Sequence, residues 1–266
     1  MKLCKSLFII AILAAAAFAQ GIQPGPGLPN QTGGGGGGGP VTVNSLSNQQ
    51  RTTASAATFT TTGVTPAGGR RLLVIAIASD SGDSNDEMDA EMTISDSQAL
   101  TWNVASTVSV STPFNRVGLK AWLTTTDAAA SSTTISVDAG TYDVYWRVAI
   151  IEVAGTDGTI AGNAVNATAA LDGGYTVTLG ATPTADDAVI FARVLRSDHN
   201  SGAGALDMAA GWTELRNDPG DGLFNGKLGV FYNDNTTSTS VVVDDTAVND
   251  AYAGAAADMA FIIKAG

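Results

Sequence analysis

The spacing of apolar residues excludes a helical architecture for most of this chain. Between residues 41 and 266 no window sustains the i, i+3, i+4, i+7 spacing of an amphipathic helix beyond about two turns. Val, Ile and Thr dominate this region, and Gly, Asn and Asp punctuate it, which is typical of strands joined by turns. The sequence therefore predicts an all-β protein with antiparallel strands.

Two runs, residues 72–78 and 148–153, are almost continuously apolar. A strand that is apolar on both faces is covered on both sides, whereas an alternating run such as 134–137 keeps one face in water. Covered and half-covered strands occur together in stacked sheets. The two runs are therefore predicted to lie centrally in a β-sandwich.

The two halves of residues 41–266 share landmarks in one order, which indicates an internal duplication. Chance similarity among Thr/Val-rich strands is the alternative. The predicted half-repeats cover about residues 65–155 and 183–266, with about five strands each. The shared landmarks are an apolar strand ending in Ser-Asp (72–80 and 189–198), a tryptophan strand (100–102 and 211–213), a Thr/Val strand (133–138 and 239–244) and a closing strand (152–155 and 263–266).

A half of about five strands would leave an apolar face and bare sheet edges in water. Pairing the two halves covers both of these surfaces. We therefore expect residues 41–266 to form a single antiparallel two-sheet β-sandwich, jelly-roll-like and built from two similar halves. Two independent domains are the alternative.

Three motifs carry a resemblance to known proteins. They are a strand ending in Ser79-Asp80, the Gly211-Trp212-Thr213 strand and the closing Glu152-Val153-Ala154-Gly155. Together they resemble the duplicated-half, jelly-roll-like β-sandwich domains of uncharacterised secreted bacterial and phage tail proteins. That resemblance covers residues 60–266 and implies a fold, but no defined activity.

Residues 1–19 have the three parts of a secretory signal peptide. Lys2 and Lys5 precede an apolar run over residues 7–17, and Ala17 and Ala19 precede a cleavage site before Gln20. We expect a secreted, extracellular or cell-surface protein, with the periplasm also open, and no membrane span after cleavage. An N-terminal membrane anchor is the alternative.

A flexible linker is predicted over residues 20–40. The segment is rich in Gly and Pro and contains a run of seven glycines, 33–39, which buries no apolar surface. A phosphate-binding glycine loop would need a preceding strand and a following helix, and the sequence has neither. The linker would hold the β-domain away from a surface or a neighbouring subunit.

Charge and composition exclude several classes of function. The formal net charge is −12, and nucleic acids and anionic membranes require clustered Lys and Arg instead. The single cysteine, Cys4, lies in the predicted leader, so thiolate metal sites and Fe–S clusters are excluded. A Ser-His-Asp site would have to use His199, the one histidine, and no Gly-x-Ser-x-Gly turn is present.

The acidic segment 80–91 is the strongest candidate metal site, because six of its twelve residues carry carboxylates. Carboxylate and amide oxygens at this density suit Ca²⁺. The EF-hand pattern is missing, and a solvated loop that keeps a sheet edge soluble is the alternative. The candidate Ca²⁺ ligands are Asp80, Asp83, Asn85, Asp86, Glu87 and Asp89.

A ligand-binding surface is the second candidate site. Aromatic rings on a sandwich can stack on sugars, although packing in the core is the alternative for each ring. The loop around His199 corresponds to the acidic segment in the repeat, and equivalent loops often emerge at one end. The candidate ligand contacts are Trp122, Tyr142, Trp146, Tyr232, Arg193, Arg196 and His199.

These features favour a secreted, non-catalytic β-sandwich with a structural or adhesive role at a cell surface, appendage or extracellular matrix. Its expected partners are copies of itself or a surface polysaccharide. A lectin-like carbohydrate-binding module with a Ca²⁺ site in the acidic segment is the alternative. A carboxylate-based hydrolase is a remote one, because Glu152, within an apolar strand, is expected to form a structural ion pair or face an edge.

Overall fold

A computed structural model describes residues 39–80, 88–112, 115–168, 175–197, 208–218, 226–243 and 253–266. By its contacts the chain divides into two units, Met1–Gly33 and Gly34–Gly266. The predicted signal peptide and the linker up to residue 38 lie outside the described residues. Within the described ranges, no helix is long and apolar enough to cross a membrane.

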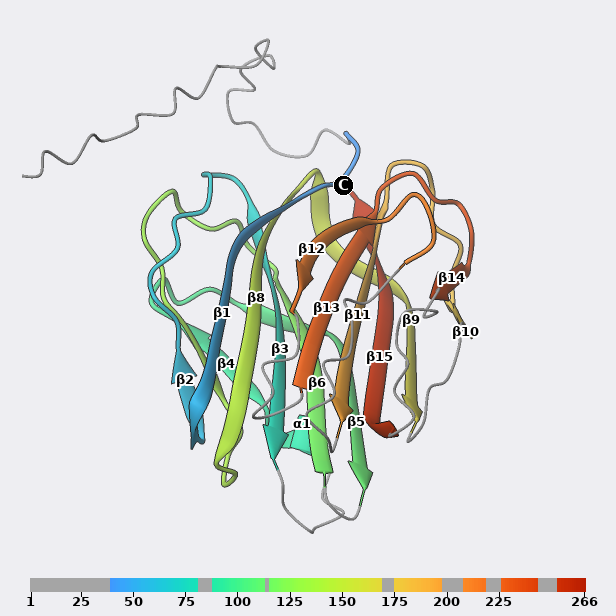
Figure 1. The fold of residues 1–266 in the computed structure, drawn as a ribbon. Helices are drawn as coiled ribbons and strands as arrows, with labels where there is room; N and C mark the ends of the chain where they lie inside the picture. The colour runs from blue at the N-terminus through green and yellow to red at the C-terminus, as the bar shows by residue number, and fades with distance from the viewer. Residues whose placement is uncertain are drawn as a thin grey trace, which may run out of the picture. The chain divides into compact units, whose positions relative to one another are not determined.

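A five-stranded antiparallel sheet forms from the first half of the β-region (Figure 1). Its central strand is β3, the apolar run predicted to be covered on both faces. The order is β1 (Thr42–Ala56), β8 (Val144–Ala154), β3 (Arg71–Asp80), β6 (Asn115–Thr124) and β5 (Trp102–Thr112).

A second five-stranded antiparallel sheet forms from the second half. Its central strand is β11, which pairs with β13 on one side and β15 on the other. The order is β12 (Thr213–Asn217), β13 (Gly226–Asn233), β11 (Ala188–Ser197), β15 (Ala253–Ala265) and β9 (Thr156–Thr168).

Two small sheets accompany these central sheets. The first has the order β2 (Thr58–Thr60), β7 (Ile135–Asp138) and β4 (Thr93–Asp96), and the second pairs β10 (Tyr175–Thr178) with β14 (Ser240–Val243). One short helix, α1 (Met88–Glu91), precedes β4.

The side chains of β3 explain how the layers pack. Alternate residues of a strand point to opposite faces, so Leu73, Ile75 and Ile77 join one core cluster and Leu72 and Val74 join another. The first cluster also holds residues of β11, β13 and β15, and therefore lies between the two central sheets. The second holds residues of β7, and a third joins β11 to β10 and β14. The layers follow the order small sheet, central sheet, central sheet, small sheet.

The all-β, antiparallel prediction is confirmed. Two central sheets are present as predicted, but in the described ranges fifteen strands form four sheets, and each central sheet takes its strands from one half. The physical reason is that each central sheet is apolar on both faces and needs a small sheet on its far side. If β4 is left out of the count, because the described part of the second half has no strand equivalent to it, the central sheets run in the same order: β1-β8-β3-β6-β5 and β9-β15-β11-β13-β12.

Both ends of the β-region meet around Gly155. The N–H of Gly266 donates to the carbonyl of Gly155 (3.0 Å), and that of Val41 donates to Asp186 (2.8 Å). A Cβ on Gly155 would lie 2.5 Å from the carbonyl oxygen of Pro40, and its φ is +73°, so glycine is required. Residues 39 and 40, the described part of the predicted linker, therefore lie at the end of the sheets that holds the C-terminus, opposite the end at which β3 finishes (Figure 1).

Candidate functional site

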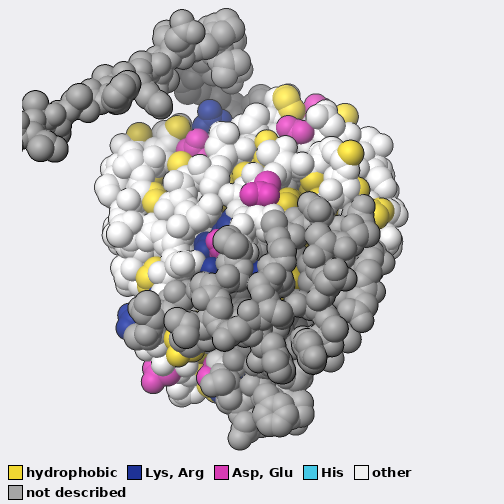
Figure 2. Space-filling model, viewed as in Figure 1, with side chains coloured by type: hydrophobic (Ala, Val, Ile, Leu, Met, Phe, Trp, Pro, Cys, Tyr) yellow, Lys and Arg dark blue, Asp and Glu magenta, His cyan; other side chains and the backbone are white. Residues whose placement is uncertain are grey.

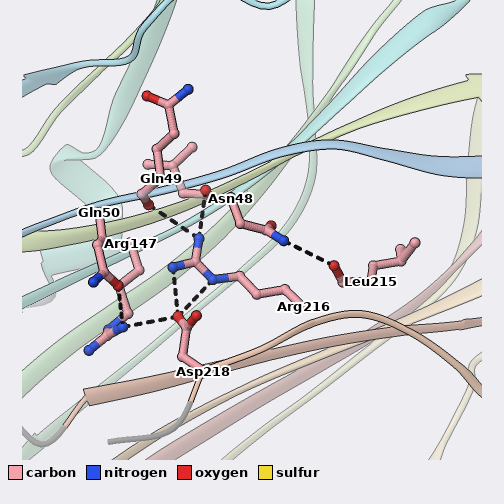
Figure 3. Close-up of polar contacts among 8 residues, drawn as sticks. Asn48, Gln49, Gln50, Arg147, Leu215, Arg216 and Asp218 are labelled. Atoms are coloured by element: carbon pink, nitrogen blue, oxygen red, sulfur yellow. Dashed lines mark hydrogen bonds and ion pairs between the residues drawn. The ribbon is translucent and has the colours of Figure 1, made fainter. Parts of the chain in front are cut away.

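A buried charge network connects the edges of the two central sheets (Figure 3). Arg216 of β12 forms an ion pair with Asp218 (2.6 Å) and donates to the carbonyl of Val148 on β8 (2.6 Å). Arg147 of β8 contacts the same carboxylate oxygen (3.0 Å) and donates to Gln50 of β1 (2.6 Å). The network therefore ties β1 and β8 of one sheet to β12 of the other.

Burial lowers the pKa of Arg216, and the Asp218 carboxylate opposes this shift. Arg216 remains a cation at neutral pH, because a guanidinium starts from a very high pKa. The network is structural in character, since each of these contacts joins elements of the fold. Sequence reasoning missed it, because no local pattern signals a pairing between positions about seventy residues apart.

The acidic segment begins with an ion pair at the end of β3. The carboxylate of Asp80 pairs with the guanidinium of Arg116 on the neighbouring strand β6. That guanidinium also lies over the ring of Tyr142, 4.6 Å from its centroid, in cation–π geometry. Asp80 and Tyr142, predicted as a Ca²⁺ ligand and a sugar contact, both contact Arg116 here.

Asp89 and Lys120 hold α1 against the first central sheet. The hydroxyl of Thr107 donates to the Asp89 carboxylate (2.8 Å), and the Lys120 ammonium donates to the carbonyls of Asp89 and Met92 (both 2.9 Å). Burial lowers the pKa of Lys120, and the negative charge of Asp89 opposes this shift. A cationic side chain therefore already neutralises part of the acidic segment.

The remaining predicted ligands, Asp83, Asn85, Asp86 and Glu87, lie outside the described residues. Among the residues that the structure does describe, no group of three or more His, Cys, Asp or Glu side chains is arranged to hold a metal ion. The Ca²⁺ site in this segment stays a prediction.

Two of the four predicted aromatic contacts belong to the core. Trp122 is 3% exposed and Trp146 is 0% exposed, and both pack in the cluster between β3 and the first small sheet. The indole N–H of Trp146 donates to the carbonyl of Ala56 (3.0 Å). A sugar platform at these two positions is wrong, because the small sheet covers the face on which they lie. Tyr232 is half-buried and packs against the core between the central sheets.

Of the basic residues predicted as ligand contacts in the second half, one is buried, and the side chains of the others lie outside the described residues. Arg193 is fully buried in β11 and lies 3.4 Å from the carboxylate of Asp258, which is also fully buried, so it is an internal ion pair and not a surface contact. The side chain of Arg196 and all of His199 lie outside the described residues. Glu152 is half-buried and accepts a hydrogen bond from the N–H of Ala67 (2.9 Å), which gives it a structural partner.

One open cavity lies where an edge strand of each central sheet comes close, β5 of the first and β9 of the second. Its volume is about 510 Å³. Its walls combine one carboxylate, one amide, two hydroxyls and two aliphatic side chains. The lining residues are Asn103, Val104, Thr125, Asp157, Gly158, Thr159 and Ile160. Sequence reasoning did not single out any of them.

The first small sheet presents a surface of a different kind. Phe59, Ile94 and Val137 point into the core, so the alternate positions of β2, β4 and β7 face outward. In register across the sheet, Thr58, Asp138 and Thr93 form one row, and Thr60, Ser136 and Ser95 form the next. We call these six residues the hydroxyl face, because five of them carry hydroxyl groups.

The hydroxyl face is ordered by its own contacts. The Thr60 and Ser136 hydroxyls lie 2.8 Å apart, and Thr58 donates to the Asp138 carboxylate. Rows on such a sheet are about 7 Å apart along the strands and neighbours within a row about 5 Å apart. More generally, charged side chains are sparse on the described surface drawn in Figure 2, where uncharged atoms dominate.

Comparison with known proteins assigns no family to the chain. No family model matches it, and no curated protein is significantly similar to it.

Proposed function

We propose that this protein is a secreted, non-catalytic β-protein with a structural or adhesive role at a cell surface, an appendage or an extracellular matrix. Its two halves would be related jelly-roll-like units. The hydroxyl face carries the proposal, because a regular array of five hydroxyl-bearing side chains and one carboxylate suits contact with a repeating, hydroxyl-rich surface. A neutral polysaccharide is such a surface.

The energetics favour an extended surface over a small ligand. Each hydroxyl–hydroxyl hydrogen bond replaces one made to water, so its net contribution is only about 1 kcal/mol. An ordered array makes several such contacts at once, without a further entropy cost for orienting each side chain. The proposed partner is therefore an insoluble neutral polysaccharide.

The predicted leader and linker fit the same role. A signal peptide over residues 1–19 would send the chain out of the cytoplasm. A flexible linker joining the sheets near Gly155 would leave the opposite end and the hydroxyl face accessible.

The proposal is tested by the binding of the purified full chain to insoluble cellulose and chitin, measured as depletion from solution, together with light scattering over a concentration series. We expect depletion by at least one polymer, or assembly with rising concentration. The variant Thr60→Glu/Ser95→Glu places two carboxylates on the hydroxyl face and should abolish depletion.

The matched control is Thr176→Glu/Thr178→Glu. It makes the same chemical change at exposed positions of β10 in the other small sheet, and it should bind as the parent does. Neither depletion nor assembly by the parent chain would overturn the proposal. Equal loss of binding in both variants would remove the hydroxyl face from it.

A further inference from the structure

The walls of the cavity between β5 and β9 are held in place by hydrogen bonds that their own residues make. The Asp157 carboxylate accepts a hydrogen bond from the N–H of Thr159 (2.7 Å), and the Thr156 hydroxyl accepts one from Gly158 (3.0 Å). These are local turn contacts that fix the backbone of the wall. At another part of the wall, the N–H of the lining residue Thr125 donates to the carbonyl of Thr101 (2.9 Å).

Arg71 supports the same wall from behind. Its guanidinium donates to the carbonyls of Thr124 (3.1 Å) and Thr156 (3.3 Å), one from each central sheet. Gly158 has a φ of +85°, and a Cβ there would lie only 2.7 Å from the Arg71 guanidinium. Glycine at this position lets the backbone pack directly on the cation, so the cavity is formed before any ligand arrives.

The chemistry of the lining is amphipathic. Hydrogen bonds from Thr159 lower the pKa of Asp157, so its carboxylate is ionised at neutral pH and accepts hydrogen bonds only. Asn103 offers an amide that both donates and accepts, and Thr125 and Thr159 offer hydroxyls. Val104 is 53% exposed, and Ile160, which also packs against the core between the central sheets, is the second aliphatic residue of the lining.

This combination selects among ligand classes. An anion is disfavoured by the Asp157 carboxylate and by the net charge of −12. A hard divalent cation requires several oxygen ligands from carboxylates or carbonyls, and the cavity lining offers a single carboxylate. A neutral molecule with hydroxyl groups on its rim and C–H groups on its face matches both the polar and the aliphatic walls.

We infer that the cavity between β5 and β9 binds one residue of a neutral carbohydrate. The Asp157 carboxylate and the Asn103 amide hydrogen-bond the sugar hydroxyls, and Val104 and Ile160 contact the C–H face of the ring. This goes beyond the proposed function, because the cavity and the hydroxyl face share no residue.

The test is saturation-transfer NMR on the full chain with glucose, galactose, mannose and N-acetylglucosamine, each titrated separately. We expect at least one sugar to receive saturation with a dissociation constant of about 1–10 mM, the range for a shallow site with few contacts. Asp157→Asn should weaken binding about tenfold, because a charge-assisted acceptor becomes a neutral one while the turn is kept. Val104→Thr should weaken it about threefold through loss of apolar contact at constant shape.

Asp127→Asn is the control, because it removes an exposed carboxylate 3.8 Å from Arg71 that does not line the cavity. It should bind as the parent does. The inference is overturned if none of the four sugars receives saturation, or if Asp157→Asn and Val104→Thr, with unchanged thermal midpoints, both bind like the control. Either result leaves the hydroxyl-face proposal standing, since that is judged on insoluble polymers.

Discussion

Asp187 connects the turn before β11 to the last strand of the chain. Its carboxylate accepts hydrogen bonds from the N–H groups of Thr184 (2.7 Å) and Ala265 (2.9 Å) and pairs with the Lys264 ammonium. Burial alone raises the pKa of Asp187, but these hydrogen bonds outweigh it and lower the pKa to about 2. Because the pKa is lower in the folded than in the unfolded protein, the ionised carboxylate stabilises the fold above about pH 4, and this is lost as pH falls through 2.

Replacing Asp187 by Asn should reduce the free energy of unfolding at pH 7 by about 2 kcal/mol, the free-energy equivalent of its pKa shift. Urea unfolding at pH 7 and at pH 2 measures this. The difference from the parent should shrink at pH 2, where both carry a neutral side chain at residue 187 for much of the time. Asp186→Asn is the control, since the Asp186 side chain is exposed. If Asp187→Asn and Asp186→Asn have the same free energy of unfolding at pH 7, the prediction is wrong.

The tryptophans show which residue roles a sequence can reveal. Trp102 and Trp212 mark equivalent strands of the predicted repeat, and both are half-buried against the outer cluster of their own half. Trp212 meets Phe191 edge-to-face at 6.3 Å, and Trp102 donates to Asp96 (2.8 Å). Repetition in the sequence was the useful signal here, whereas for Trp122 and Trp146 residue type alone did not distinguish core from surface.

At the scale of elements, one carboxylate is shared by two cations where β12 meets the β1–β8 pair. Asp218 lies between the guanidinium groups of Arg147 and Arg216, and its side chain is 17% exposed. Two buried cations held close together are costly without a shared counter-charge. The Asp218 carboxylate is therefore expected to contribute more to stability than an ordinary surface ion pair.

Asp218→Asn should reduce the free energy of unfolding by about 3 kcal/mol, because it leaves both guanidinium groups without this counter-charge. Denaturant unfolding monitored by tryptophan fluorescence measures the change. Asp234→Asn serves as the matched control, because in the described contacts Asp234 accepts only from the adjacent Asn235, and it should change stability by no more than about 0.5 kcal/mol. Equal effects of the two substitutions would show that the network does not hold the sheets together.

The strands themselves were largely predictable. The continuous apolar runs became β3 and β8, and the alternating run at 134–137 became most of β7, with one face in the core and one in the hydroxyl face. Strand pairing was not predictable, because the register of an antiparallel pair depends on residues far apart in the chain. The cavity between β5 and β9 lies between two strands that are far apart in the sequence, so no local motif predicted it.

At the scale of the whole molecule, binding of an ion to the acidic segment would change the thermal stability of the full chain. We predict that Ca²⁺ raises the thermal midpoint of the full chain by about 5–10 °C over chelator, since a ligand that binds only the folded state must stabilise it. Differential scanning calorimetry measures the shift. Asp83→Asn/Asp86→Asn should abolish it, Mg²⁺ should not reproduce it, and equal midpoints in Ca²⁺ and chelator would exclude the site.

The sequence by itself determined that this chain forms antiparallel strands and which strands are covered on both faces, because hydrophobic periodicity reports which side chains leave water. Only the tertiary structure decided that there are four layers instead of two, that Trp122 and Trp146 belong to the core, and that Asp80 pairs with Arg116. Periodicity says that a face must be covered but not what covers it. That choice is made by long-range packing, which brings together residues that the sequence keeps far apart.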